Sequence, residues 1–323
     1  WNGNSWTNHS SEEGTTSIPH SSYGGFEFGD FDNDGDWDIG VGSHGRDRVD
    51  AYLKGPGASW LQSSAGLQAS EDAWCVDVGD FNNDGNLDLL VGGFWGEDVH
   101  AYAGNGHGQW TDRSDGFERG MHSHIIVRFC DVNNDGNLDV ATNLKGGSWC
   151  YLGDGNGTWT NSSQGLPQDD YGMAVDVGDF NNDGYEDIVM CANQRTWAFA
   201  GDGTGHWTDR SSGLPAYSYN DIRLVDMNGD KYDDIVGILK GSQTVEIYLS
   251  VNGTSWVKAQ TTTMRGNGEG WRVNVGDFDH NGYPDIVAGF GTDNSMDFPG
   301  SIKVWKESST PTELAVTLTH PDG

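Results

Sequence analysis

The chain has 323 residues, of which 49 are acidic and 17 are basic, so its formal net charge is −32 at pH 7. This charge argues against nucleic acid as a partner, because proteins bind phosphates through Lys and Arg. A hydrophobic content of 35% is enough to bury a core, and 49 glycines indicate many turns. No apolar run approaches the roughly 18 residues that a membrane-spanning helix needs, so we expect no membrane span.

An acidic nine-residue motif occurs six times, at residues 30–38, 80–88, 131–139, 179–187, 226–234 and 277–285. Successive copies begin 50, 51, 48, 47 and 51 residues apart. A period near fifty is typical of a four-stranded propeller blade. The six copies contain 22 of the 49 acidic residues, so much of the negative charge belongs to the motif.

The sequence around each motif predicts four short strands per period. An alternating segment such as Val76-Asp77-Val78 precedes the motif, and an apolar run such as 89–91 follows it. Alternation with period two predicts a strand. A third strand has an aromatic at one register, namely Tyr52, Tyr102, Tyr151, Phe199, Tyr248 and Trp305. A fourth strand contributes Trp60, Trp110, Trp159, Trp207 and Trp256, which we expect to pack between neighbouring sheets.

Only five such fourth strands follow the motifs, and the sequence 4–10 resembles the missing sixth one. We therefore predict an all-β fold, a six-bladed β-propeller whose ring is closed by the N-terminal strand. The propeller would span residues 1–308, and residues 309–323 would be a linker and the start of a further domain. In the alternative, residues 314–319 form the closing strand and the N-terminus is the remnant of a seventh blade.

Oxygen-bearing side chains at positions one, three and five, followed by glycine at position six, are how a tight loop surrounds a hard cation. Position seven would offer its backbone carbonyl, and the Asp at position nine would close the site. The motif therefore predicts about six Ca²⁺ ions. The fifth copy departs from the pattern, because Lys231 stands at position six. The predicted ligands are Asp30, Asp32, Asp34, Asp36, Asp38, Asp80, Asn82, Asp84, Asn86, Asp88, Asp131, Asn133, Asp135, Asn137, Asp139, Asp179, Asn181, Asp183, Tyr185, Asp187, Asp226, Asn228, Asp230, Tyr232, Asp234, Asp277, Asp279, Asn281, Tyr283 and Asp285.

The repeated pattern V-x-V-G-D-F-N-N-D-G-x-x-D-[IL]-V resembles the FG-GAP/VCBS family, the calcium-loop propellers of integrin α heads and of some propeller lectins. The resemblance implies a calcium-stabilised propeller. It does not imply one function, because this fold serves adhesion, sugar binding and a few lyases.

Aromatic and polar residues that break the repeat fall on the face opposite the acidic loops. An aromatic platform with hydrogen-bonding edges suits a pyranose ring, although these residues could equally be rim packing. His122 and His124 alternate and could instead coordinate a transition metal. The candidate ligand-binding residues are Tyr23, Trp74, Trp95, His122, His124, Tyr171, Tyr219 and Trp271.

No nucleophile elbow, phosphate loop or zinc-protease motif occurs, so the sequence predicts no catalytic residue. We expect a non-catalytic, extracellular or cell-surface propeller, a monomer or part of a larger chain, that binds a glycan or a protein surface on its non-calcium face. One alternative is a purely structural module of a multidomain surface protein. Another is a polysaccharide lyase-type enzyme. Four sequons support secretion weakly, and the four cysteines leave their pairing open.

Overall fold

The computed structural model describes residues 25–43, 48–56, 59–68, 73–93, 98–118, 126–144, 147–167, 172–192, 194–264, 268–278, 280–291, 301–306 and 312–314. These residues contain strands and turns and no helix. None of the described segments is a helix that could cross a membrane. The prediction of an all-β protein is therefore confirmed.

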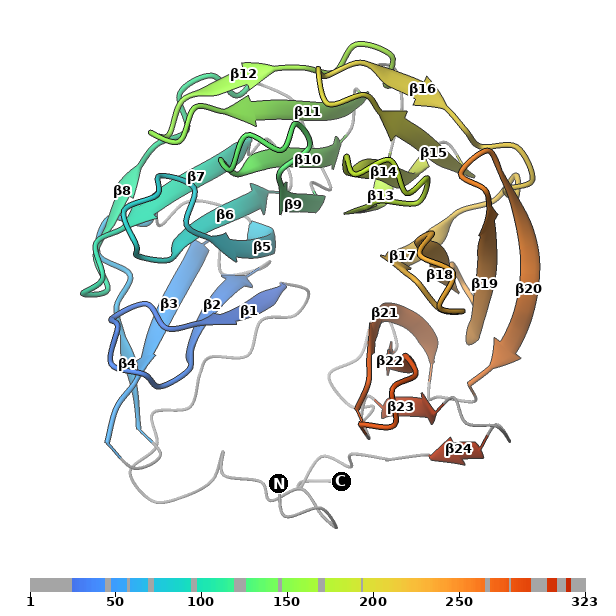
Figure 1. Ribbon diagram of the computed structural model, residues 1–323. Helices are drawn as coiled ribbons and strands as arrows, with labels where there is room; N and C mark the ends of the chain where they lie inside the picture. Colours follow the sequence, from blue (N-terminus) through green and yellow to red (C-terminus); the bar gives the residue numbers. More distant parts are fainter. Residues whose placement is uncertain are drawn as a thin grey trace. The chain divides into compact units, whose positions relative to one another are not determined.

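The strands form six antiparallel sheets of four strands, and each sheet follows the chain order predicted for one repeat (Figure 1). The first three sheets consist of β1 (Phe26–Gly29), β2 (Asp38–Ser43), β3 (Arg48–Lys54) and β4 (Trp60–Gln62); β5 (Ala73–Gly79), β6 (Asp88–Gly93), β7 (Val99–Gly104) and β8 (Trp110–Asp112); and β9 (Ile126–Cys130), β10 (Asp139–Leu144), β11 (Gly147–Gly153) and β12 (Trp159–Asn161).

The last three sheets consist of β13 (Gly172–Gly178), β14 (Asp187–Ala192), β15 (Arg195–Gly201) and β16 (Trp207–Asp209); β17 (Tyr219–Val225), β18 (Asp234–Leu239), β19 (Thr244–Val251) and β20 (Ser255–Thr263); and β21 (Glu269–Gly276), β22 (Asp285–Gly291), β23 (Ser301–Lys306) and β24 (Thr312–Leu314).

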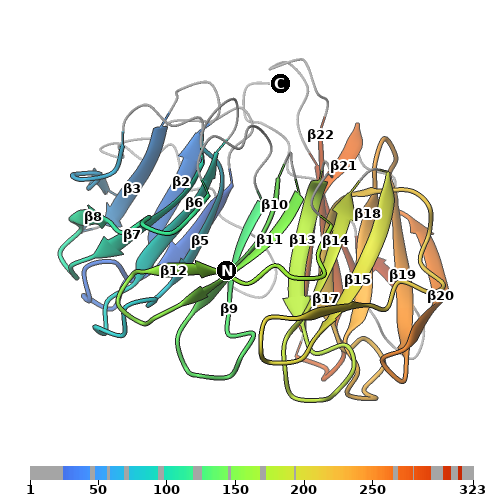
Figure 2. The same ribbon diagram turned by 90° about the horizontal axis from the view of Figure 1, so that it is seen from above.

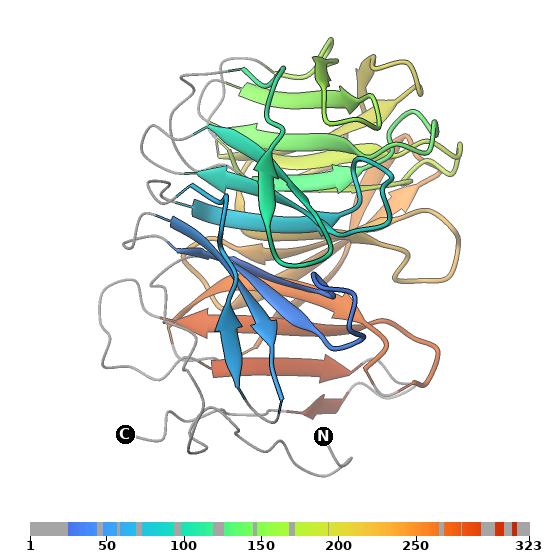
Figure 3. The same cartoon turned by 90° about the vertical axis from the view of Figure 1, so that its left-hand side faces the viewer.

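The chain divides into two compact units. The first comprises Trp1–Phe129, Gly136–Val140 and Tyr151–Asn161, and the second comprises Cys130–Asp135, Ala141–Cys150 and Ser162–Gly323. In the first unit the sheets β1–β4 and β5–β8 lie against each other (Figure 3). In the second unit β13 and β14 contact β17 of the next sheet (Figure 2).

In the second to fifth sheets, the tryptophan of the fourth strand joins its sheet to the preceding one. Four of these tryptophans are buried, and each indole Nε1 donates to a backbone carbonyl of the preceding sheet at 2.9 to 3.0 Å. An aromatic residue at position two of the preceding acidic loop packs edge-on against the ring in three cases. The pairs are Phe31–Trp110, Phe81–Trp159 and Phe180–Trp256. Core packing between neighbouring sheets, the role expected for these tryptophans, is confirmed.

A glycine is required where the chain passes each tryptophan. Gly116 has φ +107°, and a Cβ there would clash with the backbone carbonyl of Trp159. Gly213 has φ +94° and meets Trp256 in the same way. Only glycine combines this left-handed backbone with so close an approach. The turn after the fourth strand is thereby held against the tryptophan of the next sheet.

The outer strand of the sixth sheet corrects the sequence analysis. β24 pairs with β23, with Val304 opposite Leu314, so the fourth position of this sheet is filled from the C-terminal side. Residues 4–10, which were predicted to fill this position, lie outside the described residues. β24 also belongs to the segment 309–323 that was expected to be a linker and a further domain. The alternative closing strand, 314–319, overlaps β24 only at Leu314. The error arose because residues 312–314 lack the tryptophan that marks the other fourth strands.

Candidate metal centre

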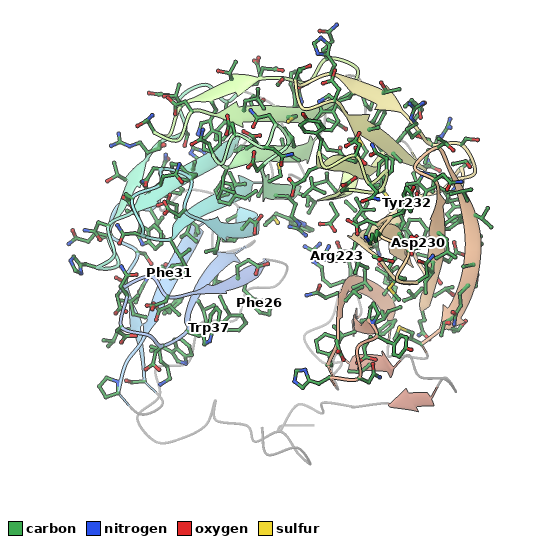
Figure 4. All side chains as sticks on the ribbon, in the orientation of Figure 1. Phe26, Phe31, Trp37, Arg223, Asp230 and Tyr232 are labelled. Atoms are coloured by element: carbon green, nitrogen blue, oxygen red, sulfur yellow. The ribbon has the colours of Figure 1, made fainter. Side chains whose placement is uncertain are left out.

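Each acidic motif forms the loop between the first and second strands of a sheet. The second motif, for example, connects β5 to β6, and its Asp88 is the first residue of β6. All six loops therefore lie at the same end of their own sheets. In Figure 4, Asp230 and Tyr232 mark the fifth loop, between β17 and β18.

Two left-handed residues give the loops their tight turn. At position four φ is between +55° and +60° at Asn33, Asn83, Asn134, Asn182 and His280. At position six the glycines have φ between +83° and +90°. Asparagine and glycine are the residues that adopt this conformation most readily.

The fifth loop keeps this backbone with different residues. Gly229 stands at position four with φ +79°, and Lys231 at position six has φ +74°. In the other loops a Cβ added to the glycine at position six would meet nothing within 4 Å. The lysine side chain therefore has space, and its cost is backbone strain. Lys231 does not abolish the loop.

Backbone amides hold the acidic side chains of the loop in place. In the first loop Asp34 N donates to Asp30 Oδ1 at 3.0 Å, and Gly35 N donates to Asp30 Oδ2 at 2.9 Å. Asp36 N then donates to Asp34 Oδ1 at 2.8 Å. The same bonds recur in the second loop and the fourth. The loop thus orders its own oxygen atoms over a span of nine residues.

The aspartate at position nine is 0% exposed in all six loops. Asp88 is typical of the group. Its Oδ2 accepts a hydrogen bond from Phe81 N at 2.9 Å, and its Oδ1 accepts one from Gly104 N at 2.8 Å. This carboxylate therefore ties together the start of the loop, the second strand and the end of the third strand.

Burial makes the ionised form of these carboxylates costly. It raises the pKa of Asp88 to about 7, of Asp187 to about 8 and of Asp234 to about 7. Neighbouring acids of the same loops raise these pKa values further, and the hydrogen bonds from backbone amides oppose the rise. Burial likewise raises the pKa of Asp38 and of Asp32. Such a site is poised to gain from a nearby positive charge.

The donor set fits a hard divalent cation. In the first loop carboxylate oxygens of Asp30, Asp32 and Asp38 lie within 4.8 Å of one another. Asp32 Oδ1 is buried and has no hydrogen-bond partner among the described residues, and the same holds for Oδ2 of Asp187. Clustered oxygen donors that lack a partner are the chemistry that Ca²⁺ accepts. Of the predicted ligands only Asp279, in the sixth loop, lies outside the described residues.

Comparison with known proteins identifies these repeats. The FG-GAP-like repeat model matches residues 30–91, 80–142, 131–190, 179–237 and 226–288. The chain belongs to the FG-GAP-like repeat family. Each match runs from one acidic loop into the second strand of the next sheet. A search of curated protein sequences gave no match.

Solved structures share the fold of this FG-GAP-like repeat protein at low sequence identity. One is a lectin from Agrocybe aegerita, whose structure was described for the specific recognition of non-reducing terminal N-acetylglucosamine. It is 15% identical, with a TM-score of 0.57 over 90% of this chain and 79% of the lectin. Another is BBS1N in complex with ARL6DN, 8% identical, with a TM-score of 0.57 over 88% of this chain and 78% of that one. At these identities the likeness concerns the fold alone.

Only three of the eight predicted ligand-binding residues of this FG-GAP-like repeat protein are among the described residues. Trp74 on β5 and Trp271 on β21 are half-buried, at the ends of their sheets away from the acidic loops. Tyr219 was expected to be exposed, and that is wrong: it is 0% exposed, because its ring lies against Gly237 of β18 and its hydroxyl donates to Glu246 on β19. Tyr23, Trp95, His122, His124 and Tyr171 lie outside the described residues.

A polar cluster around Glu246 in the fifth sheet was not predicted from the sequence. Glu246 is 4% exposed, and its Oε2 accepts hydrogen bonds from the hydroxyls of Tyr217 and Tyr219, each at 2.7 Å. Its Oε1 is paired with Lys258 Nζ on β20. Burial raises the pKa of this carboxyl, but the bond from Lys258 and the two tyrosine hydroxyls outweigh it and leave the pKa lowered. A glutamate two residues before the repeated aromatic of the third strand was the only available signal.

A second missed feature is an arginine stacked on a tryptophan. The guanidinium of Arg195 lies 4.0 Å from the ring centre of Trp197, at the start of β15. Arg195 is exposed and Trp197 is half-buried. Cation–π stacking of this kind holds a charged group flat at the surface. The pair lies at the end of its sheet that is distant from the acidic loop.

Proposed function

We propose that each acidic loop binds one Ca²⁺ through side-chain oxygens of positions one, three, five and nine and the backbone carbonyl of position seven. The observation that carries the proposal is the buried carboxylate at position nine, repeated in six loops. A bound Ca²⁺ supplies the positive charge that compensates these buried acids. The chain holds the oxygens in place through the amides of the loop and of the third strand.

Metal analysis and melting together test this proposal. After dialysis against calcium-containing buffer, inductively coupled plasma mass spectrometry should find about six Ca²⁺ per chain. Removing the metal with EDTA should lower the melting temperature by many degrees. Binding to the native state alone adds about 2.7 kcal/mol per site when calcium is a hundredfold above Kd. Calcium-free protein after dialysis, or an unchanged melting curve after verified removal, would refute it.

We propose further that the six sheets are the blades of a closed propeller. Supporting this, Phe278 at position two of the sixth loop is 46% exposed, whereas its equivalents in the other five loops are at most 7% exposed. Phe26 on β1 is 59% exposed, and its equivalents on the other first strands are at most 2% exposed (Figure 4). Apolar residues buried in every other repeat need a covering partner here as well.

By the repeat, the partner of Phe278 in a closed ring is the tryptophan of the first sheet, Trp60. Cysteines at positions 278 and 60 should then form a disulfide under mild oxidation. Leu61, the next residue of β4, alternates to the opposite face and provides the matched control pair with position 278. Equal cross-linking of both pairs, or of neither, would contradict the closed ring.

We propose that the protein acts outside the cell or on a cell surface as a recognition module for carbohydrate or for a protein surface. Calcium is abundant there, so loops of modest affinity stay filled. Carbohydrate is favoured by two observations. The fold matches a lectin described as recognising terminal N-acetylglucosamine. Each unit carries aromatic surface at the ends of its sheets away from the acidic loops, namely Trp74 in the first unit, and Trp271 and Arg195 stacked on Trp197 in the second.

A glycan array in calcium-containing buffer tests recognition. Binding to one glycan class should weaken in Trp74→Ala or Arg195→Ala. Lys54→Ala, which removes a charge at the end of β3 nearest the first loop, should leave binding unchanged. If the folded, calcium-loaded protein binds no glycan of any class on the array, the carbohydrate proposal is overturned. That result would favour a structural or protein-binding module.

A further inference from the structure

Hydrogen bonds join acidic loops of successive repeats. Asn33 Nδ2, at position four of the first loop, donates to Oδ1 of Asn86 at position seven of the second loop, at 2.8 Å. Asn83 Nδ2 repeats this toward Oδ1 of Asn137 in the third loop, at 2.9 Å. Asn134 Nδ2 then donates to the backbone carbonyl of Gly184, at position six of the fourth loop. Position four of one loop thus contacts the far side of the next in three consecutive steps.

The donor side of each link is fixed by the loop that carries it. Asn33 has φ +60° and Asn83 has φ +57°, conformations that close the turn. Directly after position four, the amides of positions five and six donate to the carboxylate at position one. The direction of the asparagine side chain therefore depends on the order of its own loop.

The acceptor side belongs to the residue that would present a backbone ligand to the ion. Asn86 N donates to Asp84 Oδ1 at 2.9 Å, and Asn86 Nδ2 donates to the same oxygen at 2.8 Å. The side chain of Asn86 is thus held between Asp84 of its own loop and Asn33 of the preceding loop. Restraining Asn86 restrains the carbonyl at position seven.

Glycines of the third-to-fourth-strand turns press against two of these amide pairs. At Gly106, an added Cβ would clash with Asn86 Oδ1 and approach Asn33 Nδ2. At Gly155, it would clash with Asn137 Oδ1 and lie 3.1 Å from Asn83 Nδ2. The backbone therefore packs against one side of each amide pair, while Asn33 and Asn83 themselves remain exposed.

We propose that Asn33, Asn83 and Asn134 are positioning residues that couple calcium binding among the first four loops. This inference rests on the proposed calcium sites. Filling one loop fixes its position-four side chain, which pre-orders position seven, or its neighbour, in the next loop. By linkage the effect is reciprocal. The fifth loop has Gly229 at position four, which has no side-chain amide, so no such link can run from the fifth loop to the sixth.

The magnitude follows from the worth of one hydrogen bond. A single link should change the calcium affinity of the adjacent loop about fivefold. Three links in series favour joint filling of the first four loops. Intermediates with one to three ions should then be depleted relative to six independent sites.

Native mass spectrometry of the full chain across a calcium titration measures this directly, because it counts ions per molecule. Asn83→Gly is the diagnostic variant: glycine supports the left-handed turn, as Gly229 does in the fifth loop, and removes only the amide. This variant should uncouple the first two loops from the third and fourth, so that a species with two bound ions accumulates. Asn182→Gly is the matched control, since no hydrogen bond from Asn182 to another loop is among those of the described residues.

The outcomes separate the coupling from the sites themselves. A protein that binds no calcium overturns both proposals. Statistically independent filling in the parent protein, or an Asn83→Gly distribution identical to the parent, overturns the coupling and leaves the calcium sites standing. A new two-ion species in Asn182→Gly as large as that in Asn83→Gly would assign the effect to the backbone change, and this also overturns the coupling.

Discussion

Replacing the buried carboxylate of the second loop by its amide, Asp88→Asn, probes what position nine contributes. Side-chain volume and shape hardly change, so cavity effects are small. One of the two oxygens becomes an amino group, which donates and cannot accept. Either Phe81 N or Gly104 N, now 2.9 and 2.8 Å from a carboxylate oxygen, must then lose its acceptor.

The expected loss of stability follows from these two bonds. A hydrogen bond to a charged acceptor contributes about 1.5–3 kcal/mol, and a buried donor left without a partner costs a comparable amount. With calcium present the variant should be destabilised by about 2–4 kcal/mol. For a chain of this size that lowers the melting temperature by roughly 4–8 °C. Without calcium at pH 8 the loss should be smaller, because burial raises the pKa of Asp88 to about 7 and its ionised form is then costly.

Differential scanning fluorimetry at pH 8, with calcium and with EDTA, measures both effects. Asp115→Asn is the control, since it removes one exposed carboxylate outside the loops. An Asp88→Asn variant as stable as the parent in calcium would refute the argument from burial. An equal loss with and without calcium would show that Asp88 acts only as a hydrogen-bond acceptor.

Three further predictions concern single groups. Lys231→Gly should stabilise the calcium-bound protein by about 1 kcal/mol, because it relieves the strain of a non-glycine residue at φ +74°; melting in calcium measures it. Burial raises the pKa of Asp88 and Asp187 to about 7 and 8, above the unfolded value of 3.8, so the metal-free protein should lose stability as the pH rises from about 4 through 8. Calcium needs the ionised acids, so the fall in melting temperature caused by EDTA should be larger at pH 8.5 than at pH 5.5. Tyr219→Phe should cost about 1–3 kcal/mol, because it removes a buried hydroxyl that binds Glu246, and denaturant unfolding measures it.

Each of these has a contrary result. A destabilised Lys231→Gly protein would mean that the lysine charge matters more to the loop than its backbone does. An EDTA effect that is independent of pH would contradict the buried, protonatable carboxylates. For the tyrosine, a loss no greater than that of an exposed Tyr283→Phe control would contradict its role in the Glu246 cluster.

Much of the fold could be predicted because its signals are local. The strand pattern, the left-handed turns and the amide bonds of each acidic loop all lie within nine or so consecutive residues. Alternation predicted the first strand of every sheet, the apolar run the second and the repeated aromatic the third. The repeated tryptophan predicted the fourth strand of the first five sheets. The sixth, β24, carries no tryptophan, so its assignment depended on pairing with β23.

What the tertiary structure decided concerns residues far apart in the chain. Tyr219 on β17 reaches Glu246 on β19 across the intervening strand β18, and no alternation within a strand encodes that contact. Asn33 and Asn86 are separated by 53 residues, and their hydrogen bond exists only because two sheets stack with their loops at one end. The sequence by itself therefore determined each loop and its chemistry. Packing of one sheet on the next decided which loops are joined by hydrogen bonds. The direction of a side chain across such an interface is set by the neighbouring sheet, which a single repeat does not contain.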